Sequence, residues 1–505
     1  MKYTIGHQDF RKIREDGLHY VDKTEGLCQI AGRGGYQFLS RPRRFGKSLT
    51  VSTLHELYSG SAELFEGLWA GAHWGFAERR RPVIWLKFAR SGFHFAGLSA
   101  AVTMMLREQG ERLGVELPGG GNLARQFTTL IEGAAATHPS GRVVVLVDEY
   151  DKPIIQYLGD TERSEANREL LRGFYSVLKD ADPYIELVFI TGVSAFSKVS
   201  LFSDLNNLQN LTLHPDAYTL LGITQAELER DFGPQLDATR HSREEVRRWY
   251  NGYAWGEHET VYNPWSILQY LQTGQLRNFW ADSGTPAFVT GMLARDAEYR
   301  VAPVKASETD LTSFNLANLN PIAILFQGGY LTVKRDLDPT HRYLLDYPNE
   351  EVRRTFLEAL LGDYGFGKSG SPTVRVGRLY DAFETRDLPT VVDVVNASLA
   401  AVPYQLWERK SEAMAHAIVH TTFSVLGLYT RSEVSTARGR ADIVVEVADY
   451  VYVIEFKIGG TVAEALAQIG ERGYAAAYAD DAREVVRVGM VFDPETRSVN
   501  DWAEG

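Results

Sequence analysis

The chain has 505 residues, 44% of them hydrophobic and 23% charged, and a formal net charge of −12. A prior of roughly 150 residues per domain gives about three domains, and the composition is globular rather than disordered or fibrous. The negative charge argues against a chain that coats nucleic acid indiscriminately, but not against a local basic groove, because phosphate contacts depend on nearby Lys and Arg.

Three features favour a cytoplasmic protein without a membrane partner. Residues 1–12 are polar and lack a hydrophobic run of signal-peptide length, and no stretch approaches the roughly 20 apolar residues that span a bilayer. The single cysteine, Cys28, cannot form an internal disulfide, which fits a reducing compartment.

The first 220 residues alternate apolar runs of strand length with amphipathic stretches, as βαβ units do. Consecutive apolar residues in such strands indicate a parallel sheet covered on both faces. We therefore predict an α/β domain, with strands at residues 36–40, 83–88, 143–147 and 187–191 and a helix from Lys47 to about Tyr58.

A phosphate-binding sequence lies between the first expected strand and this helix. A P-loop needs backbone N–H groups around the phosphates, a Lys that reaches the β and γ oxygens, and a Ser or Thr hydroxyl for Mg²⁺. Gly46, Lys47 and Ser48 supply the end of this motif, whereas the usual first glycine is replaced. The loop arginines are candidate contacts for phosphate or for a neighbouring subunit: Arg41, at the replaced glycine, Arg43 and Arg44.

The third expected strand ends in Asp148 and Glu149, the Walker-B arrangement. In that arrangement the Asp holds the Mg²⁺ shell and the Glu activates water. We therefore expect Ser48 and Asp148 to share Mg²⁺ and Glu149 to polarise the attacking water. After the next strand, Thr191 and Ser194 are candidates to face the γ-phosphate, and a simple strand-end turn is an equal alternative.

Six stretches carry a wider similarity: residues 20–24 (YVDKT), 41–48 (RPRRFGKS), 147–153 (VDEYDKP), 250–253 (YNGY), 262–266 (YNPWS) and 326–331 (FQGGYL). They resemble the AAA-ATPase-like family of bacterial proteins over nearly the whole chain. In that family an arginine-rich, glycine-poor P-loop is usual, so Arg41 is a family trait. The resemblance implies an AAA-type P-loop NTPase that binds ATP with Mg²⁺ and hydrolyses it.

From about Thr224 to Leu361 the pattern becomes mostly helical, with a short helix and strand expected in residues 322–333. Residues 365–372 have linker composition. We therefore predict three regions: an ATPase core in residues 1–223, a mainly helical lid or connecting region in residues 224–364, and a C-terminal α/β domain in residues 373–505.

In the last region, helical periodicity covers residues 399–428 and two strands are expected at residues 441–447 and 451–456. A further helix begins at Thr461, whose sequence Thr-Val-Ala-Glu has the form of a capping box.

These strands carry a candidate metal site. Glu455 and Lys457 share a face, since side chains repeat every two residues along a strand, and a hairpin would bring Asp442 alongside them. Two carboxylates can hold Mg²⁺. The metal and the ammonium can then stabilise charge on a phosphodiester and help to activate water.

This arrangement resembles the PD-(D/E)xK nuclease superfamily, whose domain usually follows the ATPase in the AAA-ATPase-like family. The resemblance implies that Asp442 and Glu455 are ligands of Mg²⁺ or Mn²⁺ and that Lys457 is the catalytic lysine. In that superfamily an acid on the preceding helix often completes the metal site. Glu412 is our candidate, and Glu433 is its competitor.

Gln468 matches a position that often carries Gln in related nucleases. The alternative to a nuclease site is that Glu455 and Lys457 are solvated residues on an exposed strand face. Many domains of the superfamily are also inactive.

The sequence thus predicts an ATP-dependent or ATP-gated, metal-dependent endonuclease that acts on DNA in preference to RNA. The competing hypothesis is a nucleotide-switched module that binds nucleic acid or protein and has an inactive nuclease domain. The third hypothesis is a mechanical remodeller. A remodeller requires ring assembly, so the sequence leaves open whether the protein forms a homo-oligomer. The domain pairing alone suggests a role in defence or mobile-element control.

Overall fold

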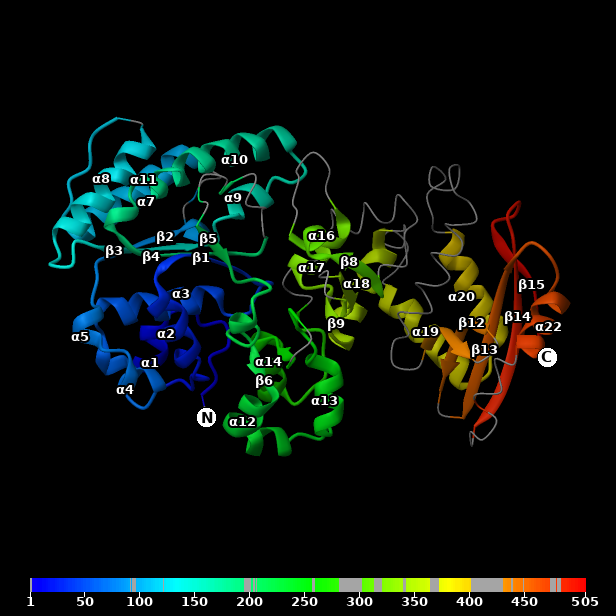
Figure 1. Ribbon diagram of the computed structural model, residues 1–505. Coiled ribbons are helices and arrows are strands. Elements are labelled where there is room, and N and C mark those ends of the chain that lie inside the picture. Colours follow the sequence, from blue (N-terminus) through cyan, green and yellow to red (C-terminus); the bar gives the residue numbers. More distant parts are fainter. Residues whose placement is uncertain are drawn as a thin grey trace. The chain divides into compact units, whose positions relative to one another are not determined.

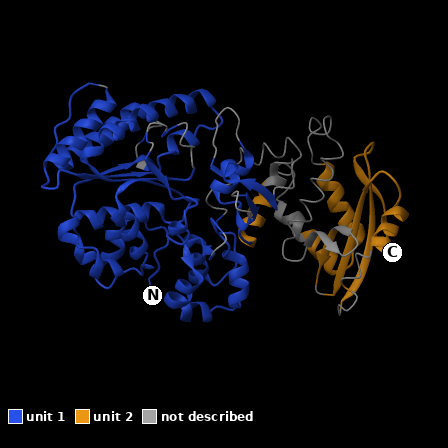
Figure 2. Ribbon diagram, in the orientation of Figure 1, with its two compact units in different colours: residues 1–283, 302–349 blue, residues 284–301, 350–505 orange. Residues whose placement is uncertain are grey.

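A computed structural model describes the chain apart from residues 1, 91, 93–96, 121, 195–200, 203, 204, 206, 257, 258, 281–301, 313–319, 339–341, 364–371, 401–429, 437, 438, 448, 473–477 and 479–482 (Figure 1). The chain divides into two compact units, residues 1–283 with 302–349 and residues 284–301 with 350–505 (Figure 2). No helix in the described part of the chain is long and apolar enough to cross a membrane.

The first unit is built on a parallel five-stranded sheet in the order β2-β3-β4-β1-β5. Its strands are β1 (Gly35–Ser40), β2 (Val83–Lys87), β3 (Val143–Asp148), β4 (Ile185–Gly192) and β5 (Leu208–Asn210). Strand β3 is buried along its whole length, as expected of an apolar strand covered on both faces. The predicted parallel sheet and four of its strands are confirmed.

Helices cover both faces of this sheet (Figure 1). One layer, below the sheet in that view, contains α1 (Phe10–Glu15), α2 (Thr24–Arg33), α3 (Lys47–Ser59), α4 (Trp69–His73) and α5 (Phe76–Arg79). The layer above contains α7 (Leu98–Leu113), α8 (Leu123–Ala136), α9 (Lys152–Ile155), α10 (Thr161–Tyr175) and α11 (Val177–Asp180). Short 3₁₀ turns lie at Ala62–Phe65, Phe88–Arg90, Asp182–Tyr184 and Pro215–Ala217. This three-layer arrangement confirms the predicted α/β class.

The rest of the first unit mixes helices with short strands. The helices are α12 (Gln225–Asp237), α13 (Arg243–Tyr250), α14 (Pro264–Thr273), α16 (Glu308–Thr312) and α17 (Pro321–Gly328). Strands β6 (Ile223–Thr224) and β7 (Val261–Tyr262) pair with each other, and β8 (Val304–Ser307), β9 (Thr332–Asp338) and β10 (Arg342–Asp346) form an antiparallel sheet. The short helix and strand expected in residues 322–333 correspond to α17 and β9, whereas β8 and β10 were not expected.

The second unit is built on a mixed sheet of β11 (Thr430–Thr436), β12 (Gly439–Glu446), β13 (Tyr450–Ile458), β14 (Glu484–Asp493) and β15 (Ser498–Glu504), in that order. Only β13 and β14 run parallel, and α22 (Val462–Arg472) connects them. The other helices are α18 (Glu350–Asp363), α19 (Pro372–Glu384) and α20 (Leu388–Ala400). Nearly all of the expected linker at residues 365–372, and all but the first two residues of the helix expected at residues 399–428, lie outside the described residues.

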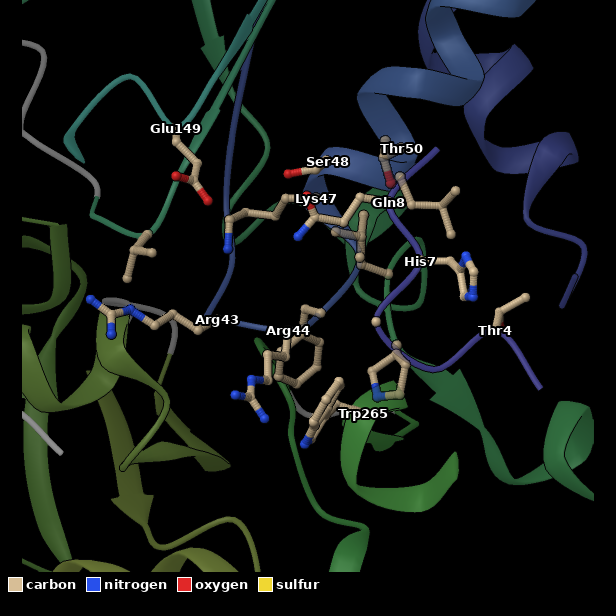
Figure 3. Close-up of a pocket in the computed structure, with 18 of the residues that line it drawn as sticks. Thr4, His7, Gln8, Arg43, Arg44, Lys47, Ser48, Thr50, Glu149 and Trp265 are labelled. Atoms are coloured by element: carbon tan, nitrogen blue, oxygen red, sulfur yellow. The ribbon is translucent and has the colours of Figure 1, made fainter. Parts of the chain in front are cut away.

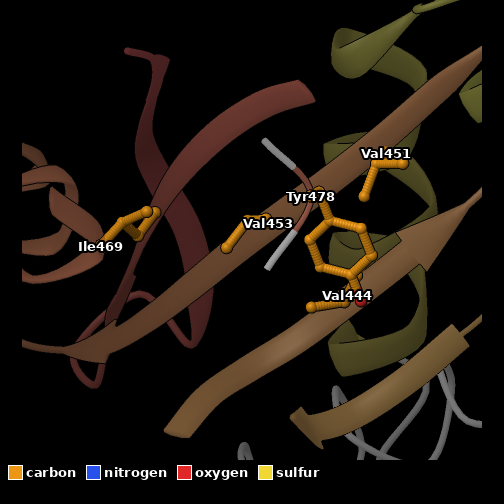
Figure 4. Close-up of a cluster of buried hydrophobic side chains, with 5 residues drawn as sticks. All are labelled: Val444, Val451, Val453, Ile469 and Tyr478. Atoms are coloured by element: carbon orange, nitrogen blue, oxygen red, sulfur yellow. The ribbon is translucent and has the colours of Figure 1, made fainter. Parts of the chain in front are cut away.

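Side chains of β13 alternate between two packed faces. On one face Val451 and Val453 join Val444 in a buried cluster with Ile469 of α22 and with Tyr478 (Figure 4). This face continues along the strand toward the predicted nuclease residues, because alternation repeats every two residues.

The opposite face and the start of α22 are held by hydrogen bonds. The Tyr452 hydroxyl donates to the carbonyl of Phe383 in α19 at 2.9 Å.

At the start of α22, Thr461 N donates to Glu464 Oε2 at 2.9 Å and Glu464 N donates to Thr461 Oγ1 at 3.3 Å. The predicted capping box is therefore present.

Candidate functional site

The loop between β1 and α3 is shaped by two residues in the left-handed region. Gly46 has φ 91° and Arg44 has φ 64°, a conformation that glycine adopts freely and arginine rarely. Helix α3 then begins at Lys47, with Gly46 as its N-cap. The loop therefore wraps the N-terminus of a 13-residue helix, where backbone N–H groups and the helix dipole favour a bound phosphate.

Arg41, which replaces the first P-loop glycine, is a buried structural residue. It is 1% exposed, and its guanidinium donates to the carbonyls of Ser40 and Thr212 at 2.9 Å and of Ala217 at 2.6 Å. The guanidinium carbon lies 3.8 Å from the centroid of the Trp255 ring. Burial lowers the pKa of Arg41 to about 9. Its side chain thus braces the loop from inside.

A pocket of about 850 Å³ opens beside the loop (Figure 3). In that view Arg43 and Glu149 lie toward one end, and Thr4 and His7 toward the other. A cavity of this size suits a small organic ligand such as a nucleotide. The pocket brings together six of the predicted residues: Arg43, Arg44, Gly46, Lys47, Ser48 and Glu149.

Lys47 and Asp148 are buried charged groups at this site. Lys47 Nζ donates to the carbonyls of Arg41 and Pro42 at 2.8 Å each, and burial lowers its pKa to about 8, against the pull of nearby carboxylates. Asp148 is 5% exposed. Burial raises the pKa of Asp148 to about 6, and a hydrogen bond with the Ser48 hydroxyl opposes the rise.

These residues fit a magnesium ion. Asp148 Oδ1 is buried and has no hydrogen-bond partner within the described residues, and the Ser48 hydroxyl lies beside the carboxylate. Mg²⁺ prefers such oxygen ligands and usually takes the remainder from water and substrate phosphates. In the described ranges no group of three or more His, Cys, Asp or Glu side chains is arranged so that it could hold a metal ion.

The turn after β3 is tied to the end of β4. Asp151 accepts hydrogen bonds from the backbone N–H of Val193 at 2.9 Å and of Ser194 at 2.5 Å, and burial raises its pKa to about 6. A Cβ on Gly192 would lie 2.5 Å from Asp151 Oδ1, so only glycine fits there. Glu149, with φ 55°, carries its carboxylate into the pocket from this turn.

Thr191 takes part in the sheet rather than in the pocket lining. Its hydroxyl donates to the carbonyl of Leu39 at 2.8 Å and so joins β4 to β1. Ser194 is buried, and its neighbour Val193 lines the pocket. The nucleotide-sensing role of Thr191 and Ser194 stays a prediction.

Helix α14 supports the P-loop in a way that was not predicted. Asn263 Oδ1 caps the helix by accepting from Trp265 N at 3.0 Å, and Asn263 Nδ2 donates to the carbonyl of Arg43 at 3.3 Å. Trp265 lines the pocket and lies under the Arg44 guanidinium at 4.0 Å. The motif YNPW, residues 262–265, was the sequence signal for this support of the P-loop. Nothing in the sequence indicated that residues 4–8 contribute to the pocket.

The second candidate site joins β13 to α22. Lys457 Nζ donates to Gln468 Oε1, and Gln468 Nε2 donates to Glu455 Oε1. Lys457 Nζ lies 3.7 Å from Glu455 Oε1, and Glu455 is 2% exposed. Gly489 of β14, paired with Glu455, lets α22 approach closely, because a Cβ there would lie 3.1 Å from the carbonyl oxygen of Val462. The side-chain amide of Gln468 thus bridges the buried Glu455 carboxylate and the Lys457 ammonium.

The remaining predicted metal ligands are placed only by the backbone. Strand β12 pairs Ile443 with Ile454, and this register, continued by one residue, puts position 442 opposite position 455. Glu433 lies in β11, and Glu412 lies outside the described residues. The metal-binding roles of Asp442, Glu412 and Glu433 stay predictions.

Comparison with known proteins gives a match for each part of the chain that holds a candidate site. A family model described as "Predicted AAA-ATPase" matches residues 4–202, and one described as "PD-(D/E)XK nuclease superfamily" matches residues 410–502. A curated protein of Azotobacter chroococcum mcd 1, "Uncharacterized protein in vnfD 5'region", is 37% identical over 513 residues, covering 99% of this chain and 98% of that protein. The chain belongs to the AAA-ATPase-like family. No solved structure matches it.

The predicted resemblance is thereby confirmed for both parts of the chain. The AAA-ATPase match contains the P-loop and the Walker-B strand, and it begins at Thr4, which lines the pocket. The PD-(D/E)XK match contains Glu455, Lys457 and Gln468.

Proposed function

We propose that this AAA-ATPase-like protein binds and hydrolyses ATP and that ATP gates a metal-dependent endonuclease acting on DNA. The observation that carries the proposal is the hydrogen-bonded set of Glu455, Gln468 and Lys457, within a PD-(D/E)XK domain, on a chain that also has a P-loop pocket. An ATPase site alone would be consistent with many activities, whereas the second site supports cleavage of a phosphodiester.

At the first site the phosphates of ATP bind at the Lys47 end of the pocket and the nucleoside at the Thr4 and His7 end. The Lys47 ammonium exchanges its loop carbonyls for the β and γ oxygens. Ser48 and Asp148 would hold Mg²⁺, which neutralises phosphate charge.

Glu149 polarises the attacking water at the same end of the pocket. A bound nucleotide can therefore influence both the P-loop and the turn after β3.

At the second site Asp442 and Glu455 would hold Mg²⁺ or Mn²⁺, which supplies electrophilic stabilisation of the phosphodiester. The buried carboxylate of Glu455 and the carboxylate residue in register opposite it are the hard oxygen donors that such an ion prefers. Lys457, oriented by Gln468, places its ammonium beside the developing negative charge.

Cleavage assays test the proposal directly. Plasmid, single-stranded DNA and RNA are incubated with Mg²⁺ or Mn²⁺, with and without ATP. We expect wild-type protein to cut DNA and Lys457→Ala to bind DNA without cutting it. Asp449→Asn is a control for a substitution elsewhere in the same sheet, because Asp449 is exposed in the β12–β13 turn, about 20 Å along the strand from Glu455 at a rise of about 3.3 Å per residue.

Failure of the wild-type protein to cut any nucleic acid, alongside measurable ATP hydrolysis, would contradict the nuclease proposal. ATP-dependent binding without cleavage would then favour the nucleotide-switched binding module.

The proposal extends to the cellular setting. We place the protein in the cytoplasm because its single cysteine, Cys28, is a buried free thiol. Homo-oligomerisation would allow a loop arginine, Arg43 or Arg44, to reach a neighbouring subunit, and mass measurement with and without ATP tests this. A role in defence or mobile-element control predicts that deletion strains accept plasmids more readily, and equal acceptance would contradict it.

A further inference from the structure

Lys152 is a charged residue that lines the P-loop pocket. The proposed mechanism of ATP hydrolysis assigns it no role. It begins α9, one turn after β3, and its backbone N–H donates to the carbonyl of Glu149 at 3.1 Å. The left-handed Glu149 closes this turn. Lys152 Nζ lies 3.1 Å from Glu149 Oε2, and both residues line the pocket.

This ion pair contributes little to folding. The side chains of Lys152 and Glu149 are 39% and 31% exposed, and pairs as accessible as this typically contribute about 0–1 kcal/mol. The turn is instead held by Asp151, which is buried and bonded to two backbone N–H groups of the β4 end. The Lys152–Glu149 contact is therefore dispensable for the fold.

The same contact is the one hydrogen bond that the Glu149 carboxylate makes within the described residues. A glutamate side chain that is one-third exposed would otherwise sample several rotamers. A catalytic base works best when a third group fixes its direction. Lys47 does not fill this role, since its ammonium is bonded to the carbonyls of Arg41 and Pro42.

We propose that Lys152 is a positioning residue for ATP hydrolysis, whose ammonium holds the Glu149 carboxylate in the direction needed to polarise the attacking water. The inference rests on the proposed ATPase function and deepens it by separating two lysines at one site. Lys47 binds phosphate, whereas Lys152 acts through Glu149.

Steady-state ATP hydrolysis by the full chain tests the assignment. Lys152→Ala should lower kcat by about tenfold with KM within about twofold, because a misdirected base slows the chemical step but leaves ATP binding intact. Lys152→Arg should restore most of the activity, since it keeps a cation at the same place. Lys179→Ala, which removes an exposed lysine from α11, is the control for the change in charge.

A double variant separates action through Glu149 from direct contact with ATP. In a Glu149→Gln background, Lys152→Ala should cause no further loss, because residues that act as a unit are not additive. An equal further loss, or a raised KM with unchanged kcat, would overturn the assignment and place Lys152 on the phosphates. Unchanged kinetics would overturn it as well.

Two further readouts keep the result unambiguous. The urea midpoint of Lys152→Ala should match that of wild type, and Lys152→Gln replaces it if the alanine variant does not fold. If the wild-type protein hydrolyses no ATP, the proposed function fails and the assignment fails with it. If the wild type is active and Lys152→Ala equals it, only the assignment fails.

Discussion

Replacing Gly192 by alanine would insert a methyl group where the ends of β3 and β4 meet. The new Cβ would lie 2.5 Å from Asp151 Oδ1 and 2.7 Å from two ring carbons of Tyr150, about 1 Å closer than the roughly 3.5–4.0 Å of an ordinary contact. Gly192 pairs with Ser40 within the sheet, so the strand cannot easily move away. The Asp151 carboxylate must therefore shift from its two backbone N–H donors.

The expected cost follows from these contacts. Overpacking a core costs about 1–3 kcal/mol, and a disturbed hydrogen bond to a charged group about 1.5–3 kcal/mol. We expect Gly192→Ala to lower the free energy of unfolding by about 3 kcal/mol, allowing for partial relaxation. Turnover of ATP should fall too, since Glu149 and Lys152 lie in the same turn.

Urea unfolding followed by circular dichroism measures this change, and the transition that ATP shifts to higher urea reports the first unit. Gly173→Ala in α10 is the matched control. A Cβ there meets no atom within 4 Å, and alanine in a helix should add about 0.5–1 kcal/mol. A Gly192→Ala protein with the urea midpoint of wild type would refute the steric argument.

Three other outcomes are expected. Burial raises the pKa of Asp148 from 3.8 to about 6, so the stability linked to this carboxyl is full below pH 3.8 and is lost as the pH rises through 6. For Asp148 alone the free energy of unfolding in EDTA should be roughly 1.4 kcal/mol lower at pH 7.5 than at pH 5. Asp148→Asn should reduce the measured pH dependence by that amount and leave the contribution of Asp151, whose pKa is also raised. Asn263 is 1% exposed, and Asn263→Asp keeps the cap of α14 but puts a carboxylate oxygen in place of the amide that donates to the Arg43 carbonyl. Calorimetry should therefore show weaker ATP binding, together with a loss of stability from the buried charge. Asn263→Ala should weaken ATP binding too and should lose about 1 kcal/mol of stability with the cap; wild-type affinity in both variants would count against this support of the P-loop. Gly489→Ala would set a Cβ 3.1 Å from atoms of α22 and should reduce DNA cleavage while ATP hydrolysis persists. Gly470→Ala is the control, because its Cβ would meet no atom within 4 Å, and it should retain both activities.

Features that depend on neighbouring residues were predictable from the sequence. Strands β3 and β4 have six and eight residues, most of them apolar, and are long enough for composition to reveal. The P-loop helix followed from the spacing of Gly46, Lys47 and Ser48. Strand β5, with three residues, is too short to leave such a pattern.

Features that depend on distant residues were not predictable in the same way. Arg41 could be named as a family trait, but its partners Thr212 and Ala217 lie 171 and 176 residues away. The contact between Lys152 and Glu149 depends on a left-handed residue that no local pattern announces. Gln468 was identified by resemblance alone, and only the packing of α22 on the sheet shows what it touches.

The replacement of the first P-loop glycine by Arg41 makes the shape of the P-loop a property of the assembled unit rather than of a short peptide. A glycine-rich loop takes its shape largely from its own backbone. This loop is held through Arg41 by hydrogen bonds to carbonyls and by contact with an indole ring, all from residues much later in the chain. A fragment that ended before Thr212 would keep the motif and lose its support. In the intact unit the loop is preorganised, so that the proposed binding of ATP would cost little conformational entropy.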